Sequence, residues 1–376
     1  MARDGIDATA ALPPAVAGEL AAIRDGTAPR RSMDPAFYTD PAMLPAEVEG
    51  VFLSGWICLC RAEEIPTPGS YLTRDVLGEP LIVTRDGTGA IRVLSNVCRH
   101  RGSRLVDGQG TTKRFTCPYH AWTYGLDGAL VRAPLIEGDL SGCHLPSFAV
   151  EEWMGWVFVN LDGTAPPHGA SLADLDPHVR NYHPEEMQAK VPTIETWAVN
   201  WKALAENFME GYHLTPVHLK TLHPMTPSRL CEKIPGGAAW TGYKSHYDDA
   251  YEGRTEVHPD MTAQEQRMSM MVWIYPGFVA AISPNSCVTM SLLPAGPEAV
   301  ETRWDVLVRK GVSEHEARAR HDFAASFNAE DKARLVELQK GLRSRFATGG
   351  PLAPPDLEGC IWDFYGWMAG RLMGQG

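Results

Sequence analysis

The chain has 376 residues, of which 44% are hydrophobic, so it is long enough for two domains and a large buried core. Its formal net charge of −12 argues against nucleic acid or an anionic membrane as a partner, because binding either one requires a basic surface. No apolar run approaches the roughly 20 residues of a membrane-spanning helix, and the start lacks the apolar segment of a signal peptide. The eight cysteines suit a reducing compartment, so we expect a cytoplasmic protein.

The first part of the chain predicts a mobile arm, a short helix near residues 15–25, and then a small domain built from strands. From Ser70 to Asn160, short β-prone runs alternate with turn signals such as Asp127-Gly128. This pattern is typical of an all-β domain, which we place at residues 45–160. Its strands are expected at 71–74, 80–85, 91–96 and 156–160.

After a proline-containing linker at residues 165–169, the second part of the chain predicts longer strands and amphipathic helices. An antiparallel sheet flanked by helices suits this order, so we expect an α+β domain formed by residues 1–44 and 161–376. Its strands are expected at 270–283, 287–293 and 303–309. Its helices are expected at 201–212, 314–327 and 330–346, with another near the C-terminus.

Two cysteine–histidine pairs form the strongest motif of the sequence. Cys98 is followed by His100, and Cys117 is followed by His120, each pair in a turn between short strands. Rieske [2Fe–2S] centres use two thiolates and two imidazoles in this way, and the neutral imidazoles raise the reduction potential. A structural zinc site accepts the same ligand types, but zinc fingers usually begin with two cysteines rather than with Cys-x-His.

The segments Cys98-Arg-His-Arg-Gly-Ser-Arg-Leu and Cys117-Pro-Tyr-His-Ala-Trp resemble the α-subunit signature of Rieske non-haem iron oxygenases. This family includes ring-hydroxylating and N-demethylating enzymes. The resemblance covers most of the chain, and it implies a helix-grip catalytic domain with the Rieske domain inserted near its front. It also implies a mononuclear Fe(II) beside the [2Fe–2S] cluster.

A second motif places His213 and His218 five positions apart in the segment that follows Asn200. On an unbroken helix that spacing would separate the two side chains by about 140°, too far for one metal. Pro216 disfavours helical geometry at the preceding residue, so the helix is expected to end at Thr215. The two imidazoles can then meet at one metal ion.

Two histidines require a carboxylate to complete the facial triad of non-haem iron oxygenases, which leaves positions open for O2. The candidate is Asp331, because the segment around Glu330 and Asp331 resembles the family's late motif, in which the second of two acids is the iron ligand. The alternative is that both acids only favour the N-terminus of a helix electrostatically.

The resemblance assigns catalytic roles to Glu210 and Asn207. An acid at the position of Glu210 bridges a Rieske histidine of one subunit to an iron-ligand histidine of its neighbour, which implies a ring, most simply a homotrimer. Glu210 would then join His213 to His120 of the partner subunit, and the alternative is a solvated glutamate. Asn207 matches an active-site asparagine, although its spacing to the bridging acid is one residue shorter than in the naphthalene type.

The electrons must come from a partner, because the chain has no dinucleotide-binding glycine motif and no ferredoxin-type run of cysteines. We expect a flavin- or ferredoxin-type reductase that draws electrons from NAD(P)H. The expected reaction of this terminal oxygenase is hydroxylation of a small organic substrate with O2, as in N-demethylation of a quaternary or methylated amine. Glu rather than Asp at position 210 is similar to the group that acts on quaternary ammonium compounds.

Three alternative functions remain, of which one is another oxygenase reaction with a different product and two are not oxygenases. They are hydroxylation of an aromatic ring by a mono- or dioxygenase, a Rieske electron carrier without oxygenase activity, and a zinc-stabilised binding module. The apolar strands are expected to line the substrate pocket, where aromatic rings could hold a quaternary ammonium group by cation–π attraction. The pocket candidates are Met270, Trp273, Tyr275, Phe278 and Met290, with Trp240 and Tyr243 as a cover. The alternative is that several of them belong to the core.

Overall fold

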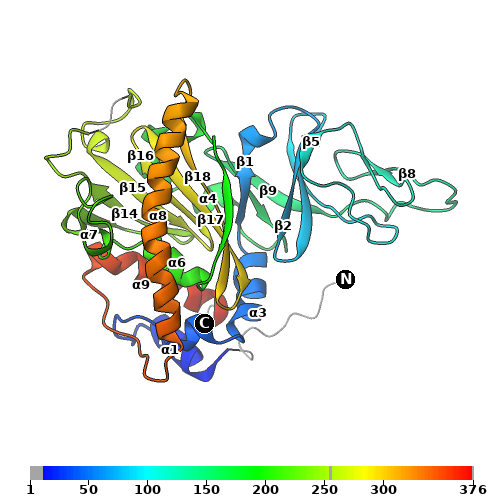
Figure 1. Ribbon diagram of the computed structural model, residues 1–376. Coiled ribbons are helices and arrows are strands. Elements are labelled where there is room, and N and C mark those ends of the chain that lie inside the picture. The colour runs from blue at the N-terminus through cyan, green and yellow to red at the C-terminus, as the bar shows by residue number, and fades with distance from the viewer. Residues whose placement is uncertain (1–11, 254–255, 375–376) are drawn as a thin grey trace. The chain divides into compact units, whose positions relative to one another are not determined.

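The computed structural model describes residues 12–253 and 256–374, which form two compact units (Figure 1). One unit comprises residues 56–165, and the other comprises residues 1–55 together with 166–376. The sequence placed these boundaries at 45 and 160. The structure moves the first one because α3 (Met43–Glu47) and the π-helix that follows it (Val48–Leu53) belong to the larger unit. The predicted arm lies outside the described residues.

The smaller unit is all-β. Seven strands form one antiparallel sheet in the order β1-β10-β9-β4-β3-β2-β5, and three short strands form a second sheet in the order β6-β7-β8. The strands expected from the sequence correspond to β2, β3, β4 and β10. The bounds are β1 (Ile57–Arg61), β2 (Ser70–Val76), β3 (Glu79–Arg85), β4 (Ile91–Ser95), β5 (Gln109–Thr111), β6 (Phe115–Thr116), β7 (Thr123–Tyr124), β8 (Leu130–Arg132), β9 (Ser147–Trp153) and β10 (Trp156–Asn160).

The larger unit is built on an antiparallel sheet of eight strands in the order β11-β18-β17-β16-β15-β14-β13, with β12 also paired to β18. The single strand expected at 270–283 is two strands, because a turn containing Pro276 separates β15 from β16. The bounds are β11 (Met187–Gln188), β12 (Thr193–Trp197), β13 (Cys231–Ile234), β14 (Trp240–His246), β15 (Met268–Ile274), β16 (Phe278–Ser283), β17 (Ser286–Gly296) and β18 (Ala299–Arg309).

Helices accompany this sheet, as the predicted α+β class requires. The long helix α8 lies across the sheet and contacts β18, whereas α9 contacts β13 and β14 (Figure 1). The helices are α1 (Pro14–Arg24), α2 (Ala36–Thr39), α4 (His168–Ser171), α5 (Asp176–Val179), α6 (Trp201–Phe208), α7 (Leu214–Val217), α8 (Glu314–Leu342) and α9 (Pro355–Leu372).

The helix α8 corrects one prediction, since the sequence predicted two helices where one continuous helix forms. Its N-terminus is capped by the Ser313 side chain, which accepts a hydrogen bond from the Glu316 amide. The expected interruption around Asn328 does not form, because the chain contains neither glycine nor proline there to break the helix. None of the helices within residues 12–253 and 256–374 is long and apolar enough to cross a membrane.

A buried polar network connects the N-terminal segment to α6 within the larger unit. Lys202 and Glu47 form an ion pair with side chains at most 1% exposed, and the Trp201 indole N–H donates to the same carboxylate at 2.7 Å. The Tyr38 hydroxyl donates to the Glu206 carboxylate at 2.9 Å. Buried charges such as those of Lys202 and Glu47 are tolerated only when they are paired. The network therefore fixes the position of α6 against the N-terminal segment.

Candidate functional site: two metal-binding constellations

The Cys98/His100/Cys117/His120 set lies at two loops of the smaller unit, one after β4 and one between β6 and β7. Both cysteines are 3% exposed, within the hydrophobic core of this unit. Both histidines are exposed, and their ring centroids lie 4.7 Å apart. Trp122 stacks on His100 at 5.0 Å. The two loops therefore bring together two buried sulfur atoms and two imidazoles at the surface.

The surroundings of the Cys117 sulfur atom favour a thiolate. Burial by itself would raise the pKa of Cys117, but hydrogen bonds from the amides of Tyr119 and His120 outweigh that effect and lower it. The Tyr124 hydroxyl lies 3.4 Å from the Cys98 sulfur. Thiolate stabilisation by backbone N–H groups is what a metal-bound cysteine requires, so these residues fit an iron–sulfur cluster.

The structure also brings together His213, His218 and Asp331. One ligand atom from each lies within 4.8 Å of the other two. The Asp331 Oδ1 atom is 3.5 Å from His213 Nε2 and 3.1 Å from His218 Nε2. His218 is 1% exposed and the other two side chains are 13% exposed, so the group is largely shielded from water.

Two further carboxylates hold the outer nitrogens of these histidines. Glu210 lies 2.5 Å from His213 Nδ1, and Glu330 lies 2.7 Å from His218 Nδ1. Glu330 also accepts a hydrogen bond from the Thr221 hydroxyl at 2.7 Å. Because a carboxylate only accepts, each Nδ1 carries a proton, and in the uncharged ring each Nε2 then presents a lone pair toward Asp331.

This arrangement fits a cation. The Asp331 Oδ1 atom is buried and receives no hydrogen bond from any residue that the structure describes. Two imidazole lone pairs face the same carboxylate oxygen, and such acceptors repel one another unless a positive charge lies between them. Burial opposes a charge on His213, but Glu210 and Asp331 outweigh that effect and raise its pKa. The site attracts positive charge, and its His/His/carboxylate donors suit Fe(II).

The local fold around the histidines differs from the expected one. Helix α6 ends at Phe208 rather than at Thr215, because the chain turns at Gly211. The Gly211 amide donates to the Leu357 carbonyl at 2.9 Å, and a Cβ atom at this position would lie 2.3 Å from the Cys231 sulfur. His213 and His218 flank the short helix α7, one directly before it and one directly after it.

The turn that follows α6 also determines the position of Glu210. Glu210 lies in the turn, where its carboxylate accepts hydrogen bonds from the amides of Tyr212 and His213 while it also contacts the His213 ring. Its exposed fraction is 9%, so it is not a solvated glutamate within the chain itself.

Glu330 contacts a histidine of this site, a role that the sequence did not predict for it. The idea that Glu330 and Asp331 favour a helix N-terminus is wrong, because α8 begins at Glu314 and both acids lie in its interior. Successive helical residues point about 100° apart. Asp331 therefore approaches the Nε2 side of His218, whereas Glu330 approaches its Nδ1 side. The signal available in the sequence was the adjacent pair of acids.

A cavity of about 510 Å³ opens onto the three ligands and onto Asn207. The strands of the sheet supply small polar and apolar side chains, and α8 supplies phenylalanines. The lining residues include Phe208, Leu222, Met225, Tyr243, Ser245, Ser269, Met271, Ala281, Ser283, Phe323, Phe327 and Asn328.

Most of the pocket candidates belong to the core, which was the alternative for several of them. Tyr243 lines the cavity, whereas Trp240, Met270, Trp273, Tyr275, Phe278 and Met290 are buried elsewhere. Met271 takes the place expected for its neighbour Met270, because successive residues of a strand face opposite sides of the sheet. The Trp273 ring packs on Phe364 of α9, with centroids 4.1 Å apart, and is therefore part of the core.

Comparisons with known proteins match a known domain to each of the two groups of metal-ligating residues. Residues 55–149 match the Rieske [2Fe-2S] domain, and residues 174–374 match the catalytic domain of the ring hydroxylating alpha subunit. The chain is 33% identical to the glycine betaine monooxygenase oxygenase subunit of Chromohalobacter salexigens, over 95% of this chain and 91% of that protein. It is 29% identical to the carnitine monooxygenase oxygenase subunit of Escherichia coli K12, over 86% and 87% of the two chains.

A solved structure extends this likeness to the fold. A quaternary ammonium Rieske monooxygenase, described in terms of carnitine oxidation and inter-subunit electron transfer, superposes with a TM-score of 0.79 at 23% identity. The match covers 91% of this chain and 95% of that one. An electron carrier made of the β domain alone would lack the match at residues 174–374. The chain therefore belongs to the ring-hydroxylating α-subunit family and is a Rieske-type oxygenase, with a [2Fe–2S] domain and a mononuclear iron domain.

Proposed function

We propose that this protein is the terminal oxygenase of a multicomponent system that hydroxylates an N-methyl carbon of a quaternary or methylated amine. The hydroxylated methyl group would then leave as formaldehyde. In this proposal His213, His218 and Asp331 hold Fe(II), and Cys98, His100, Cys117 and His120 hold the Rieske cluster. The observation that carries it is the convergence of two oriented imidazoles and an unpartnered carboxylate oxygen at the wall of one cavity.

The bound iron would supply binding and reductive activation of O2. The residues of the chain would orient the ligands and the substrate. Glu210 and Glu330 keep the Nδ1 protons of the two histidines in place, so that both Nε2 atoms stay available as ligands. The apolar lining from Phe323 and Phe327 would exclude water from the reacting methyl group.

The cavity chemistry supports a substrate that combines a cationic group with a hydrogen-bond acceptor. Aromatic side chains at Tyr243, Phe323 and Phe327 can attract a quaternary ammonium group. Asn328 is 5% exposed, and its amide nitrogen has no hydrogen-bond partner among the described residues. A carboxylate or hydroxyl oxygen of a bound substrate would satisfy that donor. The similar carnitine and glycine betaine enzymes are consistent with this class of substrate.

The electron path is the second part of the proposal. Glu210 would bridge His213 to His120 of the partner subunit, because its carboxylate already contacts the His213 ring and sits in a rigid turn. Such a path requires a ring of subunits, and we propose a homotrimer. A separate NAD(P)H-dependent reductase of flavin or ferredoxin type would reduce the cluster. The proposed location is the cytoplasm, because eight cysteines in a long chain suit a reducing compartment.

The test combines metal analysis with product analysis. Anaerobically purified protein should contain about three irons per chain and give a Rieske electron paramagnetic resonance signal after reduction with dithionite. Glycine betaine, carnitine and related amines should stimulate O2 uptake and yield formaldehyde in the presence of a reductase. A phenol or cis-diol formed from an aromatic substrate, with no formaldehyde from any methylated amine, would refute the proposed reaction and leave the oxygenase class intact.

A further inference from the structure

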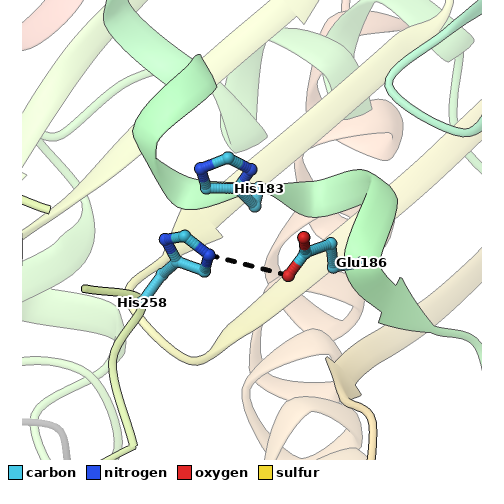
Figure 2. A group of neighbouring side chains, drawn as sticks. All are labelled: His183, Glu186 and His258. Carbon is cyan, nitrogen blue, oxygen red and sulfur yellow. Dashed lines mark ion pairs between the residues drawn. The ribbon is translucent and has the colours of Figure 1, made fainter. Parts of the chain in front are cut away.

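A second group of possible metal ligands lies in the larger unit, outside the cavity. His183 and Glu186 come from the 3-10 turns before β11, and His258 comes from the segment between β14 and β15. Their side chains face one another (Figure 2), and one ligand atom from each lies within 4.8 Å of the other two. The His183 and His258 ring centroids are 3.8 Å apart, and His258 Nε2 is 3.7 Å from a Glu186 oxygen.

Two more carboxylates surround this group. Asp260 lies 2.9 Å from His183 Nε2 and 3.7 Å from His258 Nδ1, and Glu185 lies 3.0 Å from His183 Nδ1. The nearest cation in these contacts is Arg309, 3.9 Å from Glu186. Three carboxylates therefore lie beside one guanidinium and two imidazole rings. The excess negative charge favours the binding of a cation.

Residues 180–186 and 256–267, which carry these side chains, are held in position by contacts that do not involve the ligand atoms. The Asn181 amide donates to the Glu265 carboxylate at 3.0 Å, and the Tyr182 hydroxyl donates to the Glu265 carbonyl at 3.4 Å. Arg309 donates to the carbonyl of Tyr182 at 2.7 Å and to that of His183 at 3.3 Å. The site is therefore preorganised, because the segments meet through bonds that do not involve the ligand atoms.

The backbone of His183 is a separate observation. His183 has φ 46° and ψ 58°, the left-handed region, which a non-glycine residue seldom adopts because it strains the backbone. Glycine or asparagine would adopt it more easily. The histidine at this position adopts it nevertheless, and its ring lies against His258 and Asp260.

We propose that His183, Glu186 and His258 form a second metal site that takes a divalent transition-metal ion, such as Zn²⁺, and joins residues 180–186 to residues 256–267. Two imidazoles and a carboxylate suit Zn²⁺, Co²⁺ or Ni²⁺, whereas Mg²⁺ and Ca²⁺ prefer oxygen ligands alone. The ion would act as a structural clamp, since a ligand that binds only the folded state raises stability. The inference is independent of the substrate and of the reaction proposed above.

The test uses the iron-loaded holoenzyme, so that the proposed iron site is occupied. After equilibration with Co²⁺ and removal of the excess, metal analysis should find one cobalt per chain with the iron content unchanged. Cobalt should give visible ligand-field bands, and Zn²⁺ should raise the melting temperature by a few degrees. The variants are His183→Asn, which keeps a residue that tolerates the left-handed backbone, and His258→Gln.

Both variants should lose the extra cobalt, its absorption bands and the Zn²⁺-induced rise in melting temperature. The control His315→Gln replaces an exposed histidine at the start of α8 and should keep all three. If the wild type binds no extra cobalt, or if His183→Asn binds as much as the wild type, the proposal is overturned. Retention of iron in every sample shows that any loss of cobalt does not come from the triad.

Discussion

Removal of the Glu330 carboxylate tests whether the outer hydrogen bonds hold the iron ligands in place. Glu330 lies 2.7 Å from His218 Nδ1 and accepts from Thr221 at 2.7 Å. In Glu330→Ala the imidazole loses the acceptor that fixes its tautomer and its ring orientation. Losses of this kind typically cost 10- to 100-fold in metal affinity or activity, which corresponds to about 1.4–2.7 kcal/mol.

The assay measures iron in the mononuclear site separately from the cluster. Wild type and Glu330→Ala are dialysed at a series of free Fe(II) concentrations, and the iron that exceeds the two cluster irons is counted. We expect the half-saturation concentration to rise 10- to 100-fold while the Rieske signal stays unchanged. Turnover at limiting iron should fall by the same factor, because both readouts depend on the occupancy of one site.

The matched control is Glu337→Ala on the same helix. Glu337 forms an ion pair with Lys340 in which both side chains are more than half exposed, so its loss should leave iron affinity unchanged. If Glu330→Ala binds iron as tightly as the wild type, the orientation of His218 does not depend on Glu330, and the reasoning about the paired carboxylates is refuted. A parallel loss in Glu337→Ala would indicate general destabilisation of α8 instead.

Three further predictions concern buried polar groups. Burial raises the pKa of Glu206 to about 8, so the unfolded chain releases this proton at lower pH, and the free energy of unfolding should fall between about pH 4.5 and 8. In urea unfolding, Glu206→Gln should reduce the slope of that fall by at most about 1.4 kcal/mol per pH unit. An unchanged slope would contradict the raised pKa of Glu206. Lys202→Ala should lower the free energy of unfolding by about 3–5 kcal/mol because Glu47 is left buried and unpaired. Lys202→Met combined with Glu47→Leu should recover that stability in the same assay, and a failure to recover it would show that the pair itself is strongly stabilising. Asn328→Leu should raise the KM for the amine roughly tenfold through the loss of one donor, whereas Ser326→Ala, at an exposed position of the same helix, should leave it unchanged.

The sequence by itself determined the features that depend on residues close together in the chain. The Cys98/His100 and Cys117/His120 pairs, the spacing of His213 and His218, and the four strands β2, β3, β4 and β10 follow from local patterns. The α+β class also follows, because the period of hydrophobic residues differs between strands and helices. Asp331 was placed by resemblance to a motif, and the structure sets it beside both histidines.

Only the tertiary structure decided how distant segments meet. The turn at Gly211 depends on two residues from other segments: the Cys231 sulfur leaves no room for a side chain, and the Leu357 carbonyl accepts the Gly211 amide. The cavity uses Met271 rather than Trp273 because α9 covers one end of the sheet. Glu330 gains its partner from a histidine more than a hundred residues earlier. Local propensity contains no information on such contacts, because they depend on which surfaces pack together once the chain has folded.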